Sequence, residues 1–131
     1  MKRVFIINGW GGSPQEPLLT WLRIELEKKG YLVYALNMPH PDQPTINDWV
    51  AHLAHEVGVL DNQTLFVGHS IGCQTILRYL EKQKHACGGA VFVAGWFTLQ
   101  GLETEEEQRI AEPWLTTPID FEKVKNNLPK S

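Results

Sequence analysis

Residues 64–80, TLFVGHSIGCQTILRYL, decide the fold. The stretch begins with an apolar run that predicts a buried strand over 64–67, and it ends in a sequence with the periodicity of a helix. Between these two parts lies Gly68-His69-Ser70-Ile71-Gly72, so the chain passes from strand to helix through a tight turn. A strand that runs directly into a helix is typical of βαβ units, which predicts a parallel sheet.

The same alternation of strand and helix extends outward in both directions. The other predicted strands are 4–7, 31–36 and 89–94, and further helices are predicted at 17–29, 45–57 and 121–127. In the first of these helices, Leu18, Leu22 and Leu26 recur at i, i+4 and i+8 and are expected to face the sheet. The pattern loosens from 95 to 118, where the acidic run 103–107 is interpreted as a solvated helix start.

These elements predict an open doubly wound parallel sheet in the order 2-1-3-4, with helices on both faces and right-handed crossovers. In that order the first and third strands flank the topological switch point, where ligands bind in open α/β sheets. The turn after each of these two strands then lies at the same crevice. Because the sequence holds no repeat, low-complexity tract or linker, we expect a single domain over residues 1–131.

Composition excludes several classes of protein. The chain has 12 Lys and Arg against 15 Asp and Glu, for a net charge of −3. Without a basic surplus, neither nucleic acid nor a membrane surface is an expected partner. Cys73 and Cys87 stand in no CxxC or Cys/His cluster, so we expect no metal site and reduced thiols in the cytoplasm. No apolar run approaches the roughly 20 residues of a membrane span.

Residues 68–72 match G-x-S-x-G, the nucleophile elbow. In such a turn Ser70 adopts a strained backbone conformation, and Gly68 and Gly72 let neighbouring backbone pass. The Ser70 hydroxyl then stands at a helix N-terminus, where the dipole favours developing negative charge. The alternative is a chance Gly/Ser turn, which composition alone places in about 4% of chains of this length. The strand before the motif and the helix after it favour a nucleophile.

A second glycine-rich turn, Gly9-Trp10-Gly11-Gly12, follows the first strand. The backbone N–H groups of Trp10 and Ile71 are predicted to form an oxyanion hole. Two alternatives remain open, a phosphate loop and a tight turn that binds nothing. A phosphate loop is disfavoured because Pro14 replaces the third glycine of GxGxxG, no Walker lysine follows, and Asn37 stands where a ribose-binding acid belongs. We therefore expect no cofactor.

Together these residues resemble the small serine hydrolases of the α/β-hydrolase superfamily, the retinoblastoma-binding-protein-9 and YdeN-like group. The resemblance spans essentially the whole chain. It is carried by the motif at 68–72, by Asn8 to Pro14, by Asn37-Met38-Pro39 with Trp49 downstream, and by Phe121 to Lys125. It implies an α/β-hydrolase core, a Ser/Asp/His triad with Ser70 as the nucleophile, and esterase-like activity on small acyl substrates.

The chain departs from the family pattern in the other two triad residues. In α/β-hydrolases an acid and then a histidine follow the serine, but here the only histidine after Ser70 is His85, with Glu81 the only acid between them. Both are placed on the helix that leaves the motif, so at about 1.5 Å per residue His85 ends roughly 22 Å from Ser70. The resemblance implies that the acid and histidine follow two further strands, beyond Ser131. We expect a C-terminally truncated core that is catalytically incomplete.

Other candidate residues have less support. His40, on the loop after the second strand, is a candidate substitute base or substrate contact, although a polar surface loop is the alternative. Trp96, with Phe97 and Trp114, is a candidate lining of an acyl pocket, although plain packing is the alternative. Strand alternation is expected to point His69 away from the site.

Two functional hypotheses follow. The first is a serine hydrolase of the carboxylesterase type that acts on a small ester. The second is a non-catalytic interaction protein that retains the fold without the chemistry. A sheet that ends at the strand 89–94 presents an edge for a second copy of the chain or a complementing segment.

Overall fold

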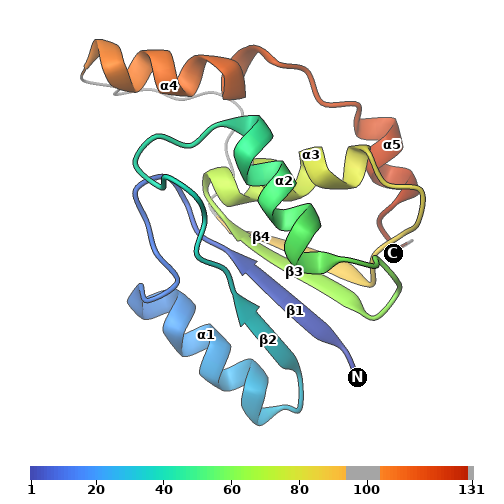
Figure 1. The fold of residues 1–131 in the computed structure, drawn as a ribbon. Helices are drawn as coiled ribbons and strands as arrows, with labels where there is room; N and C mark the ends of the chain where they lie inside the picture. The colour runs from blue at the N-terminus through green and yellow to red at the C-terminus, as the bar shows by residue number, and fades with distance from the viewer. Residues whose placement is uncertain (94–103, 130–131) are drawn as a thin grey trace.

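A computed structural model describes residues 1–93 and 104–129 (Figure 1). Its sheet has four parallel strands: β1 (Arg3–Ile7), β2 (Leu32–Ala35), β3 (Thr64–His69) and β4 (Gly89–Val93). Their order is β2-β1-β3-β4, which confirms the predicted open parallel sheet and its strand order. Ile7 pairs with Gly68, so the carboxyl ends of the two central strands lie level with each other.

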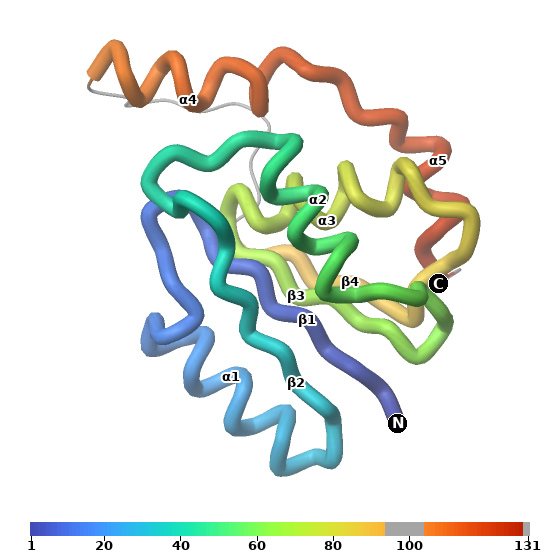
Figure 2. Tube along the Cα trace, viewed as in Figure 1, coloured from blue at the N-terminus to red at the C-terminus, as the bar shows by residue number. Residues whose placement is uncertain are grey.

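Helices lie on both faces of the sheet (Figures 1 and 2). One face carries α1 (Pro17–Lys28), and the other carries α2 (Ile46–Val57) and α3 (Ile71–Glu81), with α5 (Phe121–Asn126) against α3. The helix α4 (Glu105–Thr116) lies at the end of the molecule toward which the strands point. Within the described residues, no helix is long and apolar enough to cross a bilayer.

Strand alternation supplies two cores from the same strands, because successive side chains point to opposite faces. On the α2 and α3 face, the buried cluster includes Phe5, Ile7, Phe66, Trp49, Leu53, Ile76 and Leu80. On the α1 face, the buried cluster consists of Val4, Ile6, Leu19 and Val67. The sheet is therefore apolar on both sides, as in other parallel α/β sheets.

The predicted contact face of α1 was wrong at its first residue. Leu18 is 49% exposed and Leu19 is 2% exposed, while Leu22 and Leu26 pack partly buried against the cluster on this face. At 100° per residue, positions 19, 22 and 26 span a narrower stripe than positions 18, 22 and 26. The narrower stripe, which contains Leu19, is the one that packs against the sheet.

Two element boundaries also differ from the sequence expectation. The strand predicted over 64–67 continues to His69, because Gly68 and His69 still pair with β4. The helix α3 ends at Glu81, so His85 lies beyond it rather than on it. The sequence estimate of the distance from Ser70 to His85 assumed a helix that continues to His85. Residues 82–85 do not continue that helix, so the estimate does not hold for them.

Arg78 fixes the segment after α4 to the core. Its side chain is buried on α3, and its guanidinium donates hydrogen bonds to Gln74 Oε1 and to the backbone carbonyls of Trp114 and Thr117. Burial lowers the pKa of Arg78, an effect that Glu81 partly opposes. Because Trp114 is on α4 and Thr117 caps its C-terminus, this one side chain holds the C-terminal end of α4 against α3.

We predict that Arg78→Met lowers the free energy of unfolding by about 2–3 kcal/mol, because it leaves buried carbonyl acceptors without a charged donor. Urea denaturation followed by circular dichroism measures the change. Arg23→Met is the matched control. Arg23 forms an exposed i,i+4 pair with Glu27, so the control should change stability by less than about 0.5 kcal/mol. Equal effects of the two substitutions would contradict the anchoring role of Arg78.

Candidate functional site

Ser70 occupies the turn between β3 and α3 in an unusual backbone conformation. Its φ is 57° and its ψ is −120°, and it is the N-cap residue of α3. A non-glycine residue held at positive φ costs on the order of 1–3 kcal/mol and persists only where the surroundings enforce it. The Ser70 N–H donates to the carbonyl of Val93, at the end of β4, at 2.9 Å. Its partly exposed side chain therefore stands at the carboxyl end of the sheet and the N-terminus of a helix.

Two glycines allow this turn to form. A Cβ on Gly68 would lie 2.8 Å from the backbone nitrogen of Cys73. A Cβ on Gly72 would overlap the carbonyl oxygen of Ile7 and lie 2.9 Å from that of Asn8. The first turn of α3 therefore lies directly against the last residues of β1, at a distance that excludes any side chain.

The glycine-rich turn after β1 touches Ser70 from the other side. A Cβ on Gly9 would lie 2.9 Å from Ser70 Cβ, so the two turns meet without an intervening side chain. Asn8 is buried and donates from Nδ2 to the Gly9 carbonyl, and Gly11 has a φ of 73°. The structure thus places the turn that contains Trp10 against the turn that contains Ser70, at one crevice.

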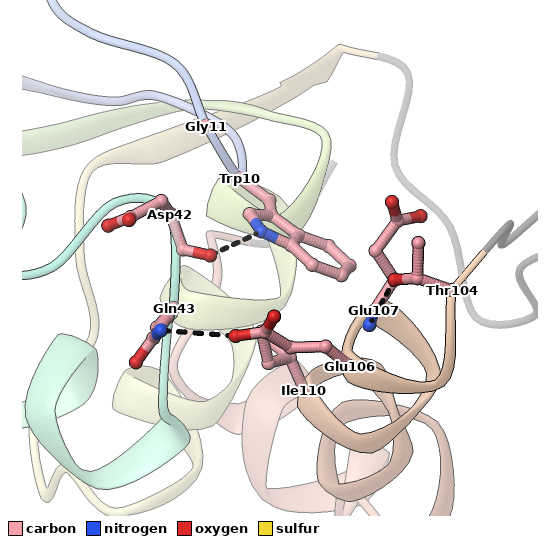
Figure 3. Close-up of a pocket in the computed structure, with 8 residues that line it drawn as sticks. All are labelled: Trp10, Gly11, Asp42, Gln43, Thr104, Glu106, Glu107 and Ile110. Atoms are coloured by element: carbon pink, nitrogen blue, oxygen red, sulfur yellow. Dashed lines mark hydrogen bonds between the residues drawn. The ribbon is translucent and has the colours of Figure 1, made fainter.

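The loop after β2 supports the glycine-rich turn. The Gly11 N–H donates to the Pro41 carbonyl at 2.6 Å, and the Trp10 indole Nε1–H donates to the Asp42 carbonyl at 3.0 Å. Figure 3 shows this indole lying beside the loop, with the Asp42 carboxylate directed away from it. Backbone and side chain of the turn are therefore both fixed to the same loop.

Two other tryptophans also donate hydrogen bonds to this loop. Trp49 of α2 donates from Nε1 to the Pro39 carbonyl at 2.8 Å, and Trp114 of α4 donates to the Pro44 carbonyl at 3.1 Å. The two rings meet edge to face, with centroids 6.1 Å apart. A proline-rich loop that cannot form regular structure is thus held by indole donors from three separate segments.

A pocket of about 590 Å³ opens beside Trp10 (Figure 3). It is lined by Trp10, Gly11, Asp42, Gln43, Thr104, Glu106, Glu107 and Ile110. Across it, Gln43 Nε2 donates to Glu106 Oε1 at 3.2 Å, and the hydroxyl of Thr104 caps α4 by accepting from the Glu107 N–H. Residues 105–107 of the acidic run do form the largely exposed first turn of α4, as the sequence predicted, but the sequence analysis did not place them at a pocket.

The structure tests the remaining candidate residues, His40 and the aromatic residues of the late segment, to different extents. His40 is exposed with a φ of 46°, and the pocket is lined by Asp42 and Gln43 of its loop instead. Trp96 and Phe97 lie outside the described residues. Trp114 is 2% exposed and packs against Trp49, which confirms the packing alternative for this residue.

The side chain of His69 lies toward α1. Its Nδ1 is 3.9 Å from Oε2 of Glu16, which immediately precedes that helix. Glu16 also accepts from the Ser13 N–H at 3.2 Å, so it holds the end of the glycine-rich turn. This placement agrees with the expectation that His69 points away from the Ser70 hydroxyl.

The cysteines offer no competing nucleophile at the turn. Cys73 and Cys87 are both free and buried, and burial raises the pKa of both thiols. The Cys73 thiol donates to the Gly68 carbonyl at 3.3 Å, which keeps it inside the turn. Among the residues that the structure describes, no group of His, Cys, Asp and Glu side chains has an arrangement suited to a metal ion.

Comparison with known proteins gives the family. The sequence pattern of the family described as serine hydrolase matches residues 4–126. The chain belongs to this serine hydrolase family. It is 37% identical over 97 residues to the putative hydrolase YdeN of Bacillus subtilis, covering 72% of this chain and 51% of YdeN. It is 29% identical over 123 residues to the serine hydrolase RBBP9 of Rattus norvegicus, covering 93% of this chain and 62% of RBBP9.

A solved structure extends the family match to three dimensions. The chain is similar to the crystal structure of the ydeN gene product from B. subtilis, with a TM-score of 0.84 and 31% identity. The similarity covers 98% of this chain and 67% of that one. The α/β-hydrolase-like fold is therefore shown, and the chain spans about half to two thirds of the length of these serine hydrolase relatives.

We predict that Gly72→Ala destabilises the protein by about 1–3 kcal/mol, because the added methyl group meets the backbone carbonyls of Ile7 and Asn8, which cannot rotate away. Gly89→Ala is the control, since the nearest atom to its added Cβ is the end of the Leu65 side chain at 3.2 Å. Thermal unfolding of both variants measures the difference. A Gly72→Ala protein as stable as Gly89→Ala would disprove the close approach of α3 to β1.

Proposed function

We propose that this chain carries the nucleophile and oxyanion hole of a carboxylesterase-type serine hydrolase, with Ser70 as the nucleophile. The backbone N–H groups of Trp10 and Ile71 are the proposed oxyanion donors. The turn at 68–72 is then a nucleophile elbow, and the substrate is a small ester.

One observation carries this proposal: the strained backbone of Ser70 at the junction of strand and helix. Strain of this kind clusters at functional sites, where the surrounding structure enforces it. Here Gly9, Gly68 and Gly72 provide that enforcement by letting three backbone segments meet around Ser70. A serine in an ordinary surface turn needs none of these contacts. Membership of the serine hydrolase family supports the same assignment.

The proposed reaction is acyl transfer through Ser70. Its Oγ attacks the ester carbonyl, a base takes the hydroxyl proton, and the carbonyl oxygen becomes an oxyanion. The N–H groups of Trp10 and Ile71, the latter at the positive end of the α3 dipole, stabilise that charge. Collapse of the tetrahedral intermediate expels the alcohol, which takes up a proton, and water then hydrolyses the acyl-enzyme.

None of the five histidines is proposed as the base. His69 lies toward Glu16 on the α1 side, and His85 is exposed beyond the end of α3. His52 and His55 lie in the C-terminal half of α2, and His40 is exposed on its loop. Without a base, the oxyanion hole and binding alone leave roughly 10³- to 10⁴-fold acceleration over water, so we expect slow turnover by residues 1–131.

We predict that a fluorophosphonate labels Ser70 and not Ser13, which lies outside the turn at 68–72. The proposed oxyanion hole stabilises the charge that develops on the phosphonyl oxygen during attack by Ser70. Peptide mass spectrometry after prolonged incubation locates the label. Ser70→Ala should abolish labelling at this site.

Labelling and ester hydrolysis test separate parts of the proposal. Equal labelling of Ser13 and Ser70, or no labelling of Ser70, would contradict its role as nucleophile. Rapid hydrolysis of p-nitrophenyl butyrate that is lost in Ser70→Ala would uphold the nucleophile and show that residues 1–131 contain a general base for it.

A second candidate function is a non-catalytic interaction protein that self-associates through β4. Within the described residues, β4 pairs with β3 alone, and Val91 and Phe92 are 58% and 39% exposed. A strand with unpaired backbone groups and exposed apolar side chains is a template for another strand. A second copy of this chain supplies such a strand in β4 itself.

If this second candidate is correct, light scattering after gel filtration shows a dimer whose fraction rises with protein concentration. Val91→Lys places a charge on the exposed edge and should shift the protein to monomer. Val59→Lys, at a 78% exposed residue after α2, is the control and should leave the dimer intact. A monomer at every concentration tested would rule out self-association.

A further inference from the structure

We propose that the pocket beside Ser70 selects esters that carry a cationic ammonium group on the alcohol or acyl part. This inference rests on the proposed function, because it assigns a substrate class to that site. The structural basis is a pocket that combines an aromatic wall with two carboxylates.

The pocket has the size and the position of a substrate site. Its volume of about 590 Å³ falls within the roughly 300–1,000 Å³ typical of small-molecule sites. Trp10 and Gly11 line it, and they directly follow Gly9, which lies against Ser70. The pocket therefore begins at the residue next to the glycine that touches Ser70, within reach of a substrate whose carbonyl is held at Ser70.

The charges around the pocket favour a cation. Glu106 and Glu107 line the wall opposite Trp10, and no lysine or arginine is among the described residues that line the pocket. Glu106 accepts from Gln43 Nε2, and its Oε1 is 3.9 Å from Nη2 of Arg109, whose side chain is 76% exposed. The two glutamates would repel a carboxylate substrate and attract an ammonium group.

The aromatic wall adds a second and independent preference for the same charge. An indole face attracts a quaternary ammonium group more strongly than the rings of Tyr or Phe do. The hydrogen bond from Trp10 Nε1 to the Asp42 carbonyl fixes the orientation of that ring. The site therefore needs no rearrangement to present the indole to a ligand.

Acidic residues in the first turn of a helix also stabilise the helix, so their presence alone says nothing about a ligand. Glu105, Glu106 and Glu107 all occupy the first turn of α4 and share that role. Of the three, Glu106 and Glu107 line the pocket and Glu105 does not. Substitution of Glu105 is therefore a matched control for substitution of Glu106 and Glu107, because all three share the helix position and only the last two line the pocket.

The test compares butyrylcholine with 3,3-dimethylbutyl butyrate, which has the same shape but a carbon in place of the charged nitrogen. Binding is measured at equilibrium in Ser70→Ala, from the NMR shift of the Trp10 indole N–H, so it does not depend on turnover. We expect butyrylcholine to bind about three- to tenfold more tightly than the neutral ester. Glu106→Gln combined with Glu107→Gln should reduce that preference to less than twofold, and Glu105→Gln should preserve it.

Equal affinities for the two esters, binding of neither, or a preference that survives the double substitution would each overturn the inference. Thermal unfolding of each variant checks that the pocket residues, and not the stability of the fold, cause the change. The fluorophosphonate label on Ser70 is read separately in the unsubstituted chain. If the unsubstituted chain is not labelled, the assignment of Ser70 as the nucleophile is refuted, but the measured preference for the cationic ester still stands.

Discussion

The structure around Ser70 depends on backbone segments that approach one another more closely than side chains permit. Gly72 lets the start of α3 lie on the carbonyls of Ile7 and Asn8, and Gly68 and Gly9 let the flanking turns close around the serine. Each contact would be lost if a methyl group stood in its place. The strained φ of Ser70 lies among these contacts, at the single residue between the end of β3 and the start of α3.

A second layer of structure holds the pocket in relation to that junction. The loop 39–44 has one backbone hydrogen bond of its own, from the Gln43 N–H to the His40 carbonyl, and other carbonyls of the loop accept from Trp10, Trp49 and Trp114. Trp114 in turn belongs to α4, whose C-terminal end is fixed by Arg78. The wall that carries Glu106 is therefore connected to α3, the same helix that begins at Ser70.

The sheet and its crevice could be predicted from sequence because both are set by local patterns. Apolar runs alternate with amphipathic stretches, and crossover handedness leaves few topologies, so the order β2-β1-β3-β4 followed. The contact face of α1 was predicted one residue early because Leu18 and Leu19 both fit an apolar stripe, and only packing on the sheet decides between them. The pocket wall was missed for a different reason. Gln43 and Glu106 meet across 63 residues of sequence, and no local pattern connects them.

The arrangement of indoles around the loop 39–44 has a spectroscopic consequence. Of the five tryptophans, Trp10, Trp49 and Trp114 donate to this one loop, and Trp49 and Trp114 are almost fully buried. Trp21 is 58% exposed on α1. Intrinsic fluorescence is thus weighted toward the neighbourhood of the pocket rather than averaged over the fold. A red shift in emission at constant circular dichroism would report that the loop has separated from its three indole donors while the sheet and helices persist.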